Sequence, residues 1–181
     1  MTVYIAFLRG INVGGHKLIK MADLKQLLET MGLTKVQTYI QSGNVLFESE
    51  EESDQLRQQI EDHISTRFGF SVPVILRTST ELSRIIENCP FPVETLPEGE
   101  SVHLSLMAEL PTQEGIDLLQ KFQGDEDEYQ IEGREVYLYL RQSIRNSKLA
   151  IQLQKLGVPS TLRNWKTMKK LAALAEAMDN I

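Results

Sequence analysis

The order of strand-like and helix-like segments is the feature that most constrains how this chain can fold. Residues 3–9 form an almost unbroken apolar run, typical of a strand buried on both faces, and residues 21–31 carry apolar side chains at helical spacing. A hairpin at residues 35–47, a helix at 53–68 and a strand at 72–76 follow. This βαββαβ order predicts a ferredoxin-like unit, an antiparallel sheet with both helices on one face.

The second half of the chain repeats this order, without a repeat of the residues themselves. A strand at 102–107, a helix opening at Pro111, a hairpin spanning 129–140 and a helix at 147–156 are predicted, and only the short segment 160–162 is left for the last strand. The sequence therefore predicts an α+β protein with two ferredoxin-like halves.

A proline-rich stretch marks the boundary between the halves. We expect the N-terminal half at residues 1–78, a helix and linker at 79–100, and the C-terminal half at 101–181. The chain then closes on a helix predicted over 163–178, which carries one apolar face.

Composition bears on the disulfides, membrane segments and cellular compartment that we expect for the protein. The chain has 181 residues, of which 41% are hydrophobic and 24% charged, and Cys89 is its single cysteine, so no internal disulfide can form. No basic region precedes the first apolar run, and no run reaches the length of a membrane span. We expect a cytoplasmic protein with no membrane partner and no cofactor.

Charge is unevenly distributed along the chain. Residues 136–175 contain no Asp or Glu and eight Lys or Arg, so the other residues together carry −14 within a net charge of −6. A basic block of this kind is as often a solvated face as a ligand site. The acidic runs at 50–52 and 125–128 are predicted to be solvated loops.

The first candidate site is the glycine-rich loop that follows the first strand. No acidic residue precedes Asp23, and glycines free backbone N–H groups beside polar and basic side chains, which are the parts needed to hold an anion. The first and third strands are neighbours in the predicted topology, so this loop should approach the hairpin turn. The candidate ligand-binding residues are Arg9, Asn12, Gly14, Gly15, His16, Lys17, Ser42 and Asn44.

Each of these residues also has a purely structural interpretation. The glycines can serve only to form a tight turn, and Arg9 can pair with Glu48 as readily as clamp a phosphate. The loop lacks the Gly-Lys-Ser/Thr ending of a phosphate loop, and GxGxxG is absent. His16 would need a partner such as Ser42 to act as a base.

The second candidate site is basic and lies near the C-terminus. In the predicted second half, the ends of the third and fourth strands share one sheet edge, which could bind phosphates of a nucleotide or RNA. The residues are Arg141, Arg145, Arg163, Asn164 and Trp165. Spacing favours Trp165 as a core residue, and aromatic residues between the cations are few, which weakens the nucleic-acid interpretation.

Metal binding has little support in the sequence. His16, His63 and His103 are far apart, and Cys89 has no second ligand at metal-binding spacing. We therefore expect no metal site.

Three motifs resemble one known family. LRGINVGG at 8–15, TYIQSGNVLF at 38–47 and TLRNWKT at 161–167, with Met21 and Leu24, are similar to motifs of the DUF1697 family of small bacterial proteins. The resemblance implies an α+β fold of two ferredoxin-like halves, and it implies no activity.

Taken together, these features predict a binding protein for an anionic, phosphate-bearing ligand, either a nucleotide or a nucleic-acid segment. One alternative is an enzyme that acts on a small phosphorylated or acidic substrate, with the first loop stabilising developing charge. Another is an oligomeric scaffold without a ligand, such as a homodimer formed through an open sheet.

Overall fold

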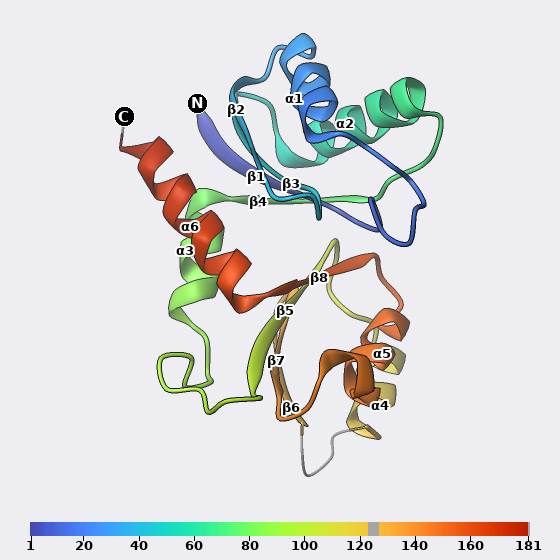
Figure 1. The fold of residues 1–181 in the computed structure, drawn as a ribbon, viewed down its shortest axis with the longest axis vertical. Coiled ribbons are helices and arrows are strands. Elements are labelled where there is room, and N and C mark those ends of the chain that lie inside the picture. Colours follow the sequence, from blue (N-terminus) through green and yellow to red (C-terminus); the bar gives the residue numbers. More distant parts are fainter. Residues whose placement is uncertain (123–126, 181) are drawn as a thin grey trace. The chain divides into compact units, whose positions relative to one another are not determined.

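The computed structural model of the protein describes residues 1–122 and 127–180. The chain divides into two compact units, one formed by Met1–Ser83 with Lys170–Ile181 and the other by Arg84–Lys169. Each unit contains one four-stranded antiparallel sheet, and helix α6 (Trp165–Asp179) closes the chain (Figure 1). The predicted α+β class with two ferredoxin-like halves is confirmed.

The first unit has the predicted βαββαβ order. Its sheet has the strand order β2-β3-β1-β4, so β1 lies between β3 and β4 and is antiparallel to both. The elements are β1 (Thr2–Leu8), α1 (Met21–Thr30), β2 (Thr34–Tyr39), β3 (Asn44–Ser49), α2 (Ser53–Phe68) and β4 (Val74–Thr78).

One face of this sheet holds the core of the first unit. Tyr4, Ala6 and Leu8 alternate along β1 and pack in one apolar cluster with Leu28 of α1 and Ile60 of α2. Figure 1 shows both helices on the same side of the sheet. The helices therefore cover one face of the sheet.

The second unit repeats the arrangement with the strand order β6-β7-β5-β8. The last strand is longer than predicted, because Arg163 and Asn164 continue the pairing with β5 before α6 begins at Trp165. The elements are β5 (Ser101–Met107), α4 (Gln113–Gln120), β6 (Asp127–Glu132), β7 (Glu135–Leu140), α5 (Lys148–Gln152) and β8 (Ser160–Asn164).

The helix predicted at 147–156 is shorter than expected. It ends as α5 at Gln152 and continues as a tighter 3-10 turn, η2 (Leu153–Lys155). Gly115 of α4 approaches this segment so closely that a Cβ at Gly115 would lie 2.5 Å from the carbonyl oxygen of Leu156. Contact between these segments, which are far apart in sequence, accompanies the change from α to 3-10 geometry.

The two sheets place an arginine at the same register position. At the centre of β1, Ile5 pairs with Arg77 of β4; at the centre of β5, Leu104 pairs with Arg163 of β8. The last strand of each sheet thus carries Leu-Arg followed by a polar residue that caps a helix. Thr78 accepts a hydrogen bond from Glu81 N at the start of α3 (Ser79–Glu87).

None of the helices within residues 1–122 and 127–180 is long and apolar enough to cross a membrane.

Candidate functional site

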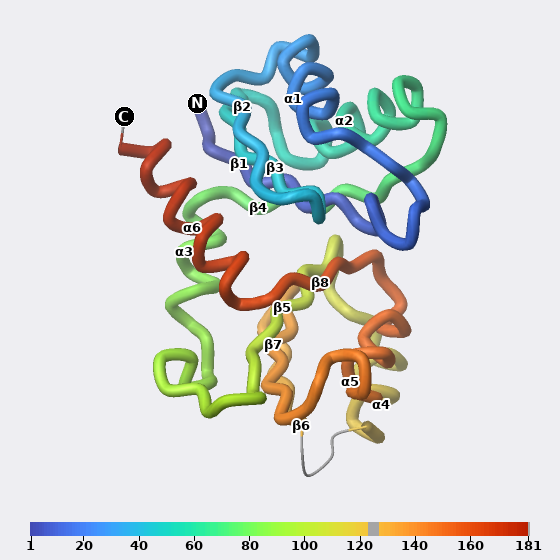
Figure 2. Tube along the Cα trace, viewed as in Figure 1, coloured from blue at the N-terminus to red at the C-terminus, as the bar shows by residue number. Residues whose placement is uncertain are grey.

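Three loops meet at one end of the first sheet, as the strand order requires. They are residues 9–20 after β1, residues 40–43 between β2 and β3, and residues 69–73 before β4; we call them the loop edge. Figure 2 shows the three segments at the same end of the sheet.

Hydrogen bonds join these loops to one another. Leu8 N donates to Gly43 O at 2.8 Å, and Arg9 N donates to Pro73 O at 3.0 Å. Lys17 Nζ donates to Ser71 O at 2.8 Å. The predicted approach of the first loop to the hairpin turn is therefore present in the structure.

Asn12 is the residue that holds the loop edge together. Its Nδ2 donates to Ile19 O at 3.0 Å and to Gln41 O at 2.9 Å, and its Oδ1 accepts from Ile19 N at 2.8 Å. Its φ of 56° lies in the left-handed region, which Asn tolerates better than most residues. Asn12 thus acts as a brace between two loops, with both amide protons already used.

A tight turn forms the tip of the first loop. His16 N donates to Val13 O at 3.0 Å, and Gly14 and Gly15 between them have φ of 59° and 75°. Both glycines and the His16 side chain are exposed. The glycines are needed because two successive left-handed residues strain any side chain with a Cβ.

The charge of the loop edge is wholly positive. Its three loops contain Arg9, Lys17 and Lys20 and no Asp or Glu. Among residues 1–122 and 127–180, no carboxylate lies at ion-pair distance from the Arg9 guanidinium, which is half-buried at the end of β1. Glu48, the acid considered as a partner for Arg9, pairs with Lys35 at 3.1 Å.

The hairpin residues have structural roles. Asn44 is fully buried, and its Nδ2 donates to Tyr39 O at 3.1 Å and to Ser42 Oγ at 3.0 Å. These bonds close the turn from inside. Ser42 is exposed beside it, so within this hairpin it is the better placed of the two to meet a ligand.

Replacing Asn12 tests the brace. Asn12→Ala removes three hydrogen bonds and leaves an alanine at positive φ, so we expect the free energy of unfolding to fall by about 2 kcal/mol. Asn12→Gly restores the backbone freedom and removes the same bonds, so the difference between the two variants measures the φ strain. Urea titration followed by far-UV circular dichroism provides both values, and a loss below about 0.5 kcal/mol in Asn12→Ala would contradict the brace.

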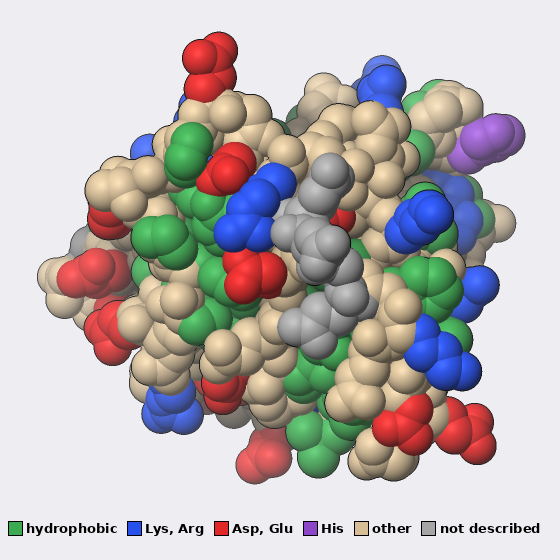
Figure 3. All heavy atoms as spheres, turned by 90° about the horizontal axis from the view of Figure 1, so that it is seen from below, with side chains coloured by type: hydrophobic (Ala, Val, Ile, Leu, Met, Phe, Trp, Pro, Cys, Tyr) green, Lys and Arg blue, Asp and Glu red, His purple; other side chains and the backbone are tan. Residues whose placement is uncertain are grey.

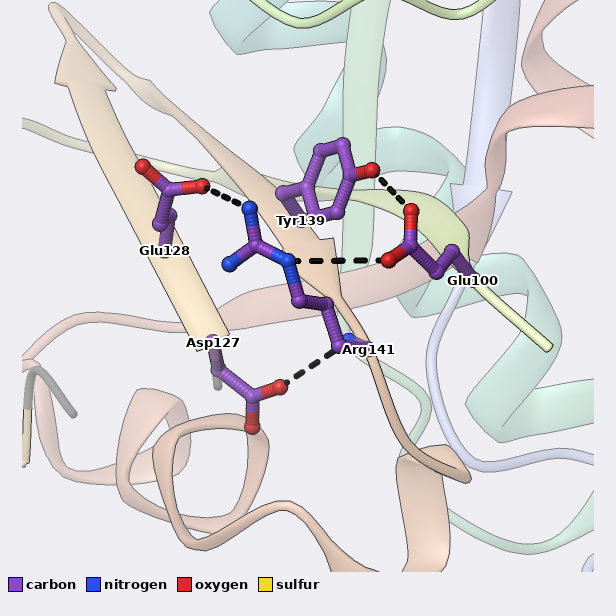
Figure 4. Close-up of polar contacts among 5 residues, drawn as sticks. All are labelled: Glu100, Asp127, Glu128, Tyr139 and Arg141. Atoms are coloured by element: carbon purple, nitrogen blue, oxygen red, sulfur yellow. Dashed lines mark hydrogen bonds and ion pairs between the residues drawn. The ribbon is translucent and has the colours of Figure 1, made fainter. Parts of the chain in front are cut away.

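The second candidate site is not an open basic surface at Arg141. Arg141 Nη2 lies 3.0 Å from Glu128 Oε2, and Arg141 Nε lies 3.6 Å from Glu100 Oε1. The guanidinium carbon of Arg141 lies 4.7 Å from the ring centre of Tyr139. Tyr139 also donates a hydrogen bond to Glu100 (Figure 4). Two carboxylates therefore already neutralise this arginine.

Arg163 and its neighbours are used by the fold. Arg163 Nη1 donates to Thr161 Oγ1 at 2.7 Å and to Leu162 O at 3.0 Å, and burial lowers the pKa of Arg163 to about 10. Trp165 is buried, as its spacing predicted. Asn164 Oδ1 accepts from Thr167 N at 2.8 Å and so caps α6.

Arg145 is exposed, as Arg141 is, whereas Arg163 is buried. On the face drawn in Figure 3, blue Lys and Arg side chains are mostly separated by neutral or acidic ones. The structure therefore brings the first predicted set of residues together and gives the members of the second set separate roles.

The expectation that Asp127 lies in a solvated loop is wrong. Asp127 begins β6 and is buried, and its carboxylate accepts from Ser147 Oγ at 2.7 Å, Gln142 Nε2 at 2.8 Å and Arg141 N at 3.2 Å. Neighbouring residues 125–126 lie outside the described residues. Alternation with Tyr129 and Ile131 is the signal that could have placed Asp127 on an inward face.

The described residues contain no group of His, Cys, Asp and Glu side chains that could hold a metal ion. Burial raises the pKa of the Cys89 thiol, whose Sγ lies 3.9 Å from Phe91 O. A protonated thiol is a poor nucleophile and a poor metal ligand.

Comparisons with known proteins agree with the fold. A family model described as "Protein of unknown function (DUF1697)" matches residues 1–137. The solved structure of a conserved bacterial protein from Streptococcus pneumoniae is 28% identical and superimposes with a TM-score of 0.78, covering 96% of this chain and 98% of that one. A comparison with curated proteins gave no match.

Proposed function

The chain belongs to the DUF1697 family of proteins of unknown function, and from that premise we propose that it is a binding protein whose loop edge recognises an anionic, phosphate-bearing ligand. One observation carries the proposal: Arg9 directly follows a buried strand without a carboxylate partner among the described residues, in loops that contain no acid. A half-buried guanidinium in such surroundings favours an anionic ligand.

The chemistry of the neighbouring groups favours phosphate. Arg9 can donate two parallel hydrogen bonds to phosphate oxygens, and Lys17 and Lys20 add positive charge on the same loop. The bonds of Asn12 hold the loop in place before a ligand arrives, so little ordering entropy is lost on binding. A nucleotide and a nucleic-acid segment both present this group.

The exposed His16 gives the enzymatic alternative no support of its own. Within the described part of the chain, no carboxylate or hydroxyl is hydrogen-bonded to its ring. A general base is normally oriented by such a partner. We therefore propose binding rather than catalysis.

Thermal-shift measurements with inorganic phosphate, ADP and a short single-stranded RNA test the proposal. A ligand at 100 times its Kd adds about 2.7 kcal/mol of stability, which raises Tm by roughly 5–10 °C in a chain of this size. Arg9→Ala should weaken binding by about tenfold or more, because a hydrogen bond to a charged group is lost. Only the RNA arm should show a steep decrease of affinity with salt.

Arg145→Ala is the matched control, since it removes an exposed arginine of the second candidate site. Arg145→Ala should leave the ligand-induced rise in Tm unchanged. Equal losses in Arg9→Ala and Arg145→Ala, or no shift with any of the three probes, would rule out the loop edge as the binding site.

A further inference from the structure

Apolar side chains project from the same loops that carry the positive charge. Val13 is 67% exposed, Leu18 65% and Ile40 49%. Val13 flanks the glycine turn, Leu18 follows Lys17, and Ile40 belongs to the hairpin loop that Asn12 ties to the first loop through Gln41 O. Three of the large apolar side chains that the protein exposes therefore lie on the loop edge.

The backbone of Ile40 is a second and independent observation. Its φ is 48°, in the left-handed region that a β-branched residue adopts only under strain. The fold therefore holds an isoleucine at the surface in an unfavourable conformation, where a glycine or asparagine would fit more easily. Strain of this kind is concentrated at functional positions.

These apolar side chains have no use in binding a free phosphate. A phosphate is recognised by donors and positive charge, whereas exposed Val, Leu and Ile gain free energy only by leaving water. A lipid bilayer offers both partners at once, because anionic headgroups lie directly above the apolar acyl chains.

We propose that the loop edge docks on an anionic lipid surface, with Val13, Leu18 and Ile40 entering the headgroup layer while Arg9, Lys17 and Lys20 contact lipid phosphates. The inference rests on the proposed recognition of phosphate by the same loops. The expectation of no membrane partner came from the lack of a spanning segment, and docking through side chains requires none.

A docked protein partner would need a larger complementary surface. Stable protein interfaces bury about 800 Å² on each side, whereas a lipid surface can be held by a few inserted side chains and several cations. The turn at Val13–His16 is short and exposed, which suits insertion better than it suits a flat interface.

Vesicle flotation with the full chain tests the proposal. The vesicles are phosphatidylcholine alone, or phosphatidylcholine with 30 mol% phosphatidylglycerol (about a third anionic lipid, enough for a negative surface potential). We expect partition onto the anionic vesicles only, weakened by high salt because the headgroup attraction is screened. Lys20→Gln should reduce the partition coefficient by about fivefold, the effect of one cation near the surface.

Leu18→Ser is the variant that isolates insertion. It should reduce partition by about tenfold, because a leucine side chain no longer leaves water. Leu110→Ser is its matched control, since Leu110 is 66% exposed and lies in the second unit, and it should leave partition unchanged. Both residues are exposed, so both variants should keep the wild-type Tm.

The outcomes separate the two proposals. Binding of inorganic phosphate or ADP through Arg9, with no partition onto either kind of vesicle, would overturn docking and leave phosphate recognition standing. Partition that is insensitive to Leu18→Ser would also overturn docking. If no anion binds and the protein partitions onto neither kind of vesicle, both phosphate recognition and lipid docking are overturned.

Discussion

Gly43→Ala is expected to lower the free energy of unfolding of the first unit by about 3 kcal/mol. Gly43 has a φ of +89°, where an alanine costs about 1–2 kcal/mol relative to glycine. A Cβ there would also lie 2.8 Å from Ile11 Cδ1 and 2.9 Å from Leu8 Cβ. Leu8 Cβ cannot move without its backbone, so the overlap adds about 1–3 kcal/mol of overpacking.

Gly10→Ala is the control for Gly43→Ala. Gly10 also has positive φ, +74°, but a Cβ there would meet nothing within 4 Å. Its substitution should cost only the backbone strain, about 1–2 kcal/mol. Urea titration by far-UV circular dichroism gives both values; equal losses in the two variants would mean that close packing at Gly43 is unimportant.

The second large effect is expected from Asp127→Ala in the second unit. The buried carboxylate receives three hydrogen bonds that tie the segment after β7 to β6, and Ser147, one of its donors, is also fully buried and caps α5. A hydrogen bond to a charged group contributes about 1.5–3 kcal/mol and the bonds are not independent, so we expect a loss of about 3 kcal/mol.

The single tryptophan, Trp165, is buried in the second unit, so its fluorescence follows unfolding of the part that Asp127 stabilises. Asp127→Asn keeps one acceptor oxygen and should lose less than Asp127→Ala. Glu128→Ala is the matched control, because it removes a more exposed carboxylate one residue away whose ion pair with Arg141 contributes about 0–1 kcal/mol. A loss in Asp127→Ala no larger than in Glu128→Ala would contradict this role of Asp127.

The βαββαβ order makes β1 and β3 neighbours, and this alone predicts that the first loop and the hairpin turn share one end of the sheet. The roles of individual residues were not predictable in the same way. Asn12 and Asn44 are braces because their amides meet the carbonyls of Ile19, Gln41 and Tyr39, which depends on the folded path of each loop.

Sequence alone determined the element order and the topology shared by the two halves, because hydrophobic periodicity and turn chemistry act between residues close in the chain. It also showed directly that the loops of the loop edge contain no Asp or Glu. Tertiary structure alone decided which charges remain available. Arg141 is neutralised by Glu100 and Glu128, and the buried Asp127 accepts a hydrogen bond from Ser147. The residues in these contacts are 13 to 41 positions apart in the sequence. Burial and pairing depend on what the fold brings to a side chain, and the residue type does not reveal it.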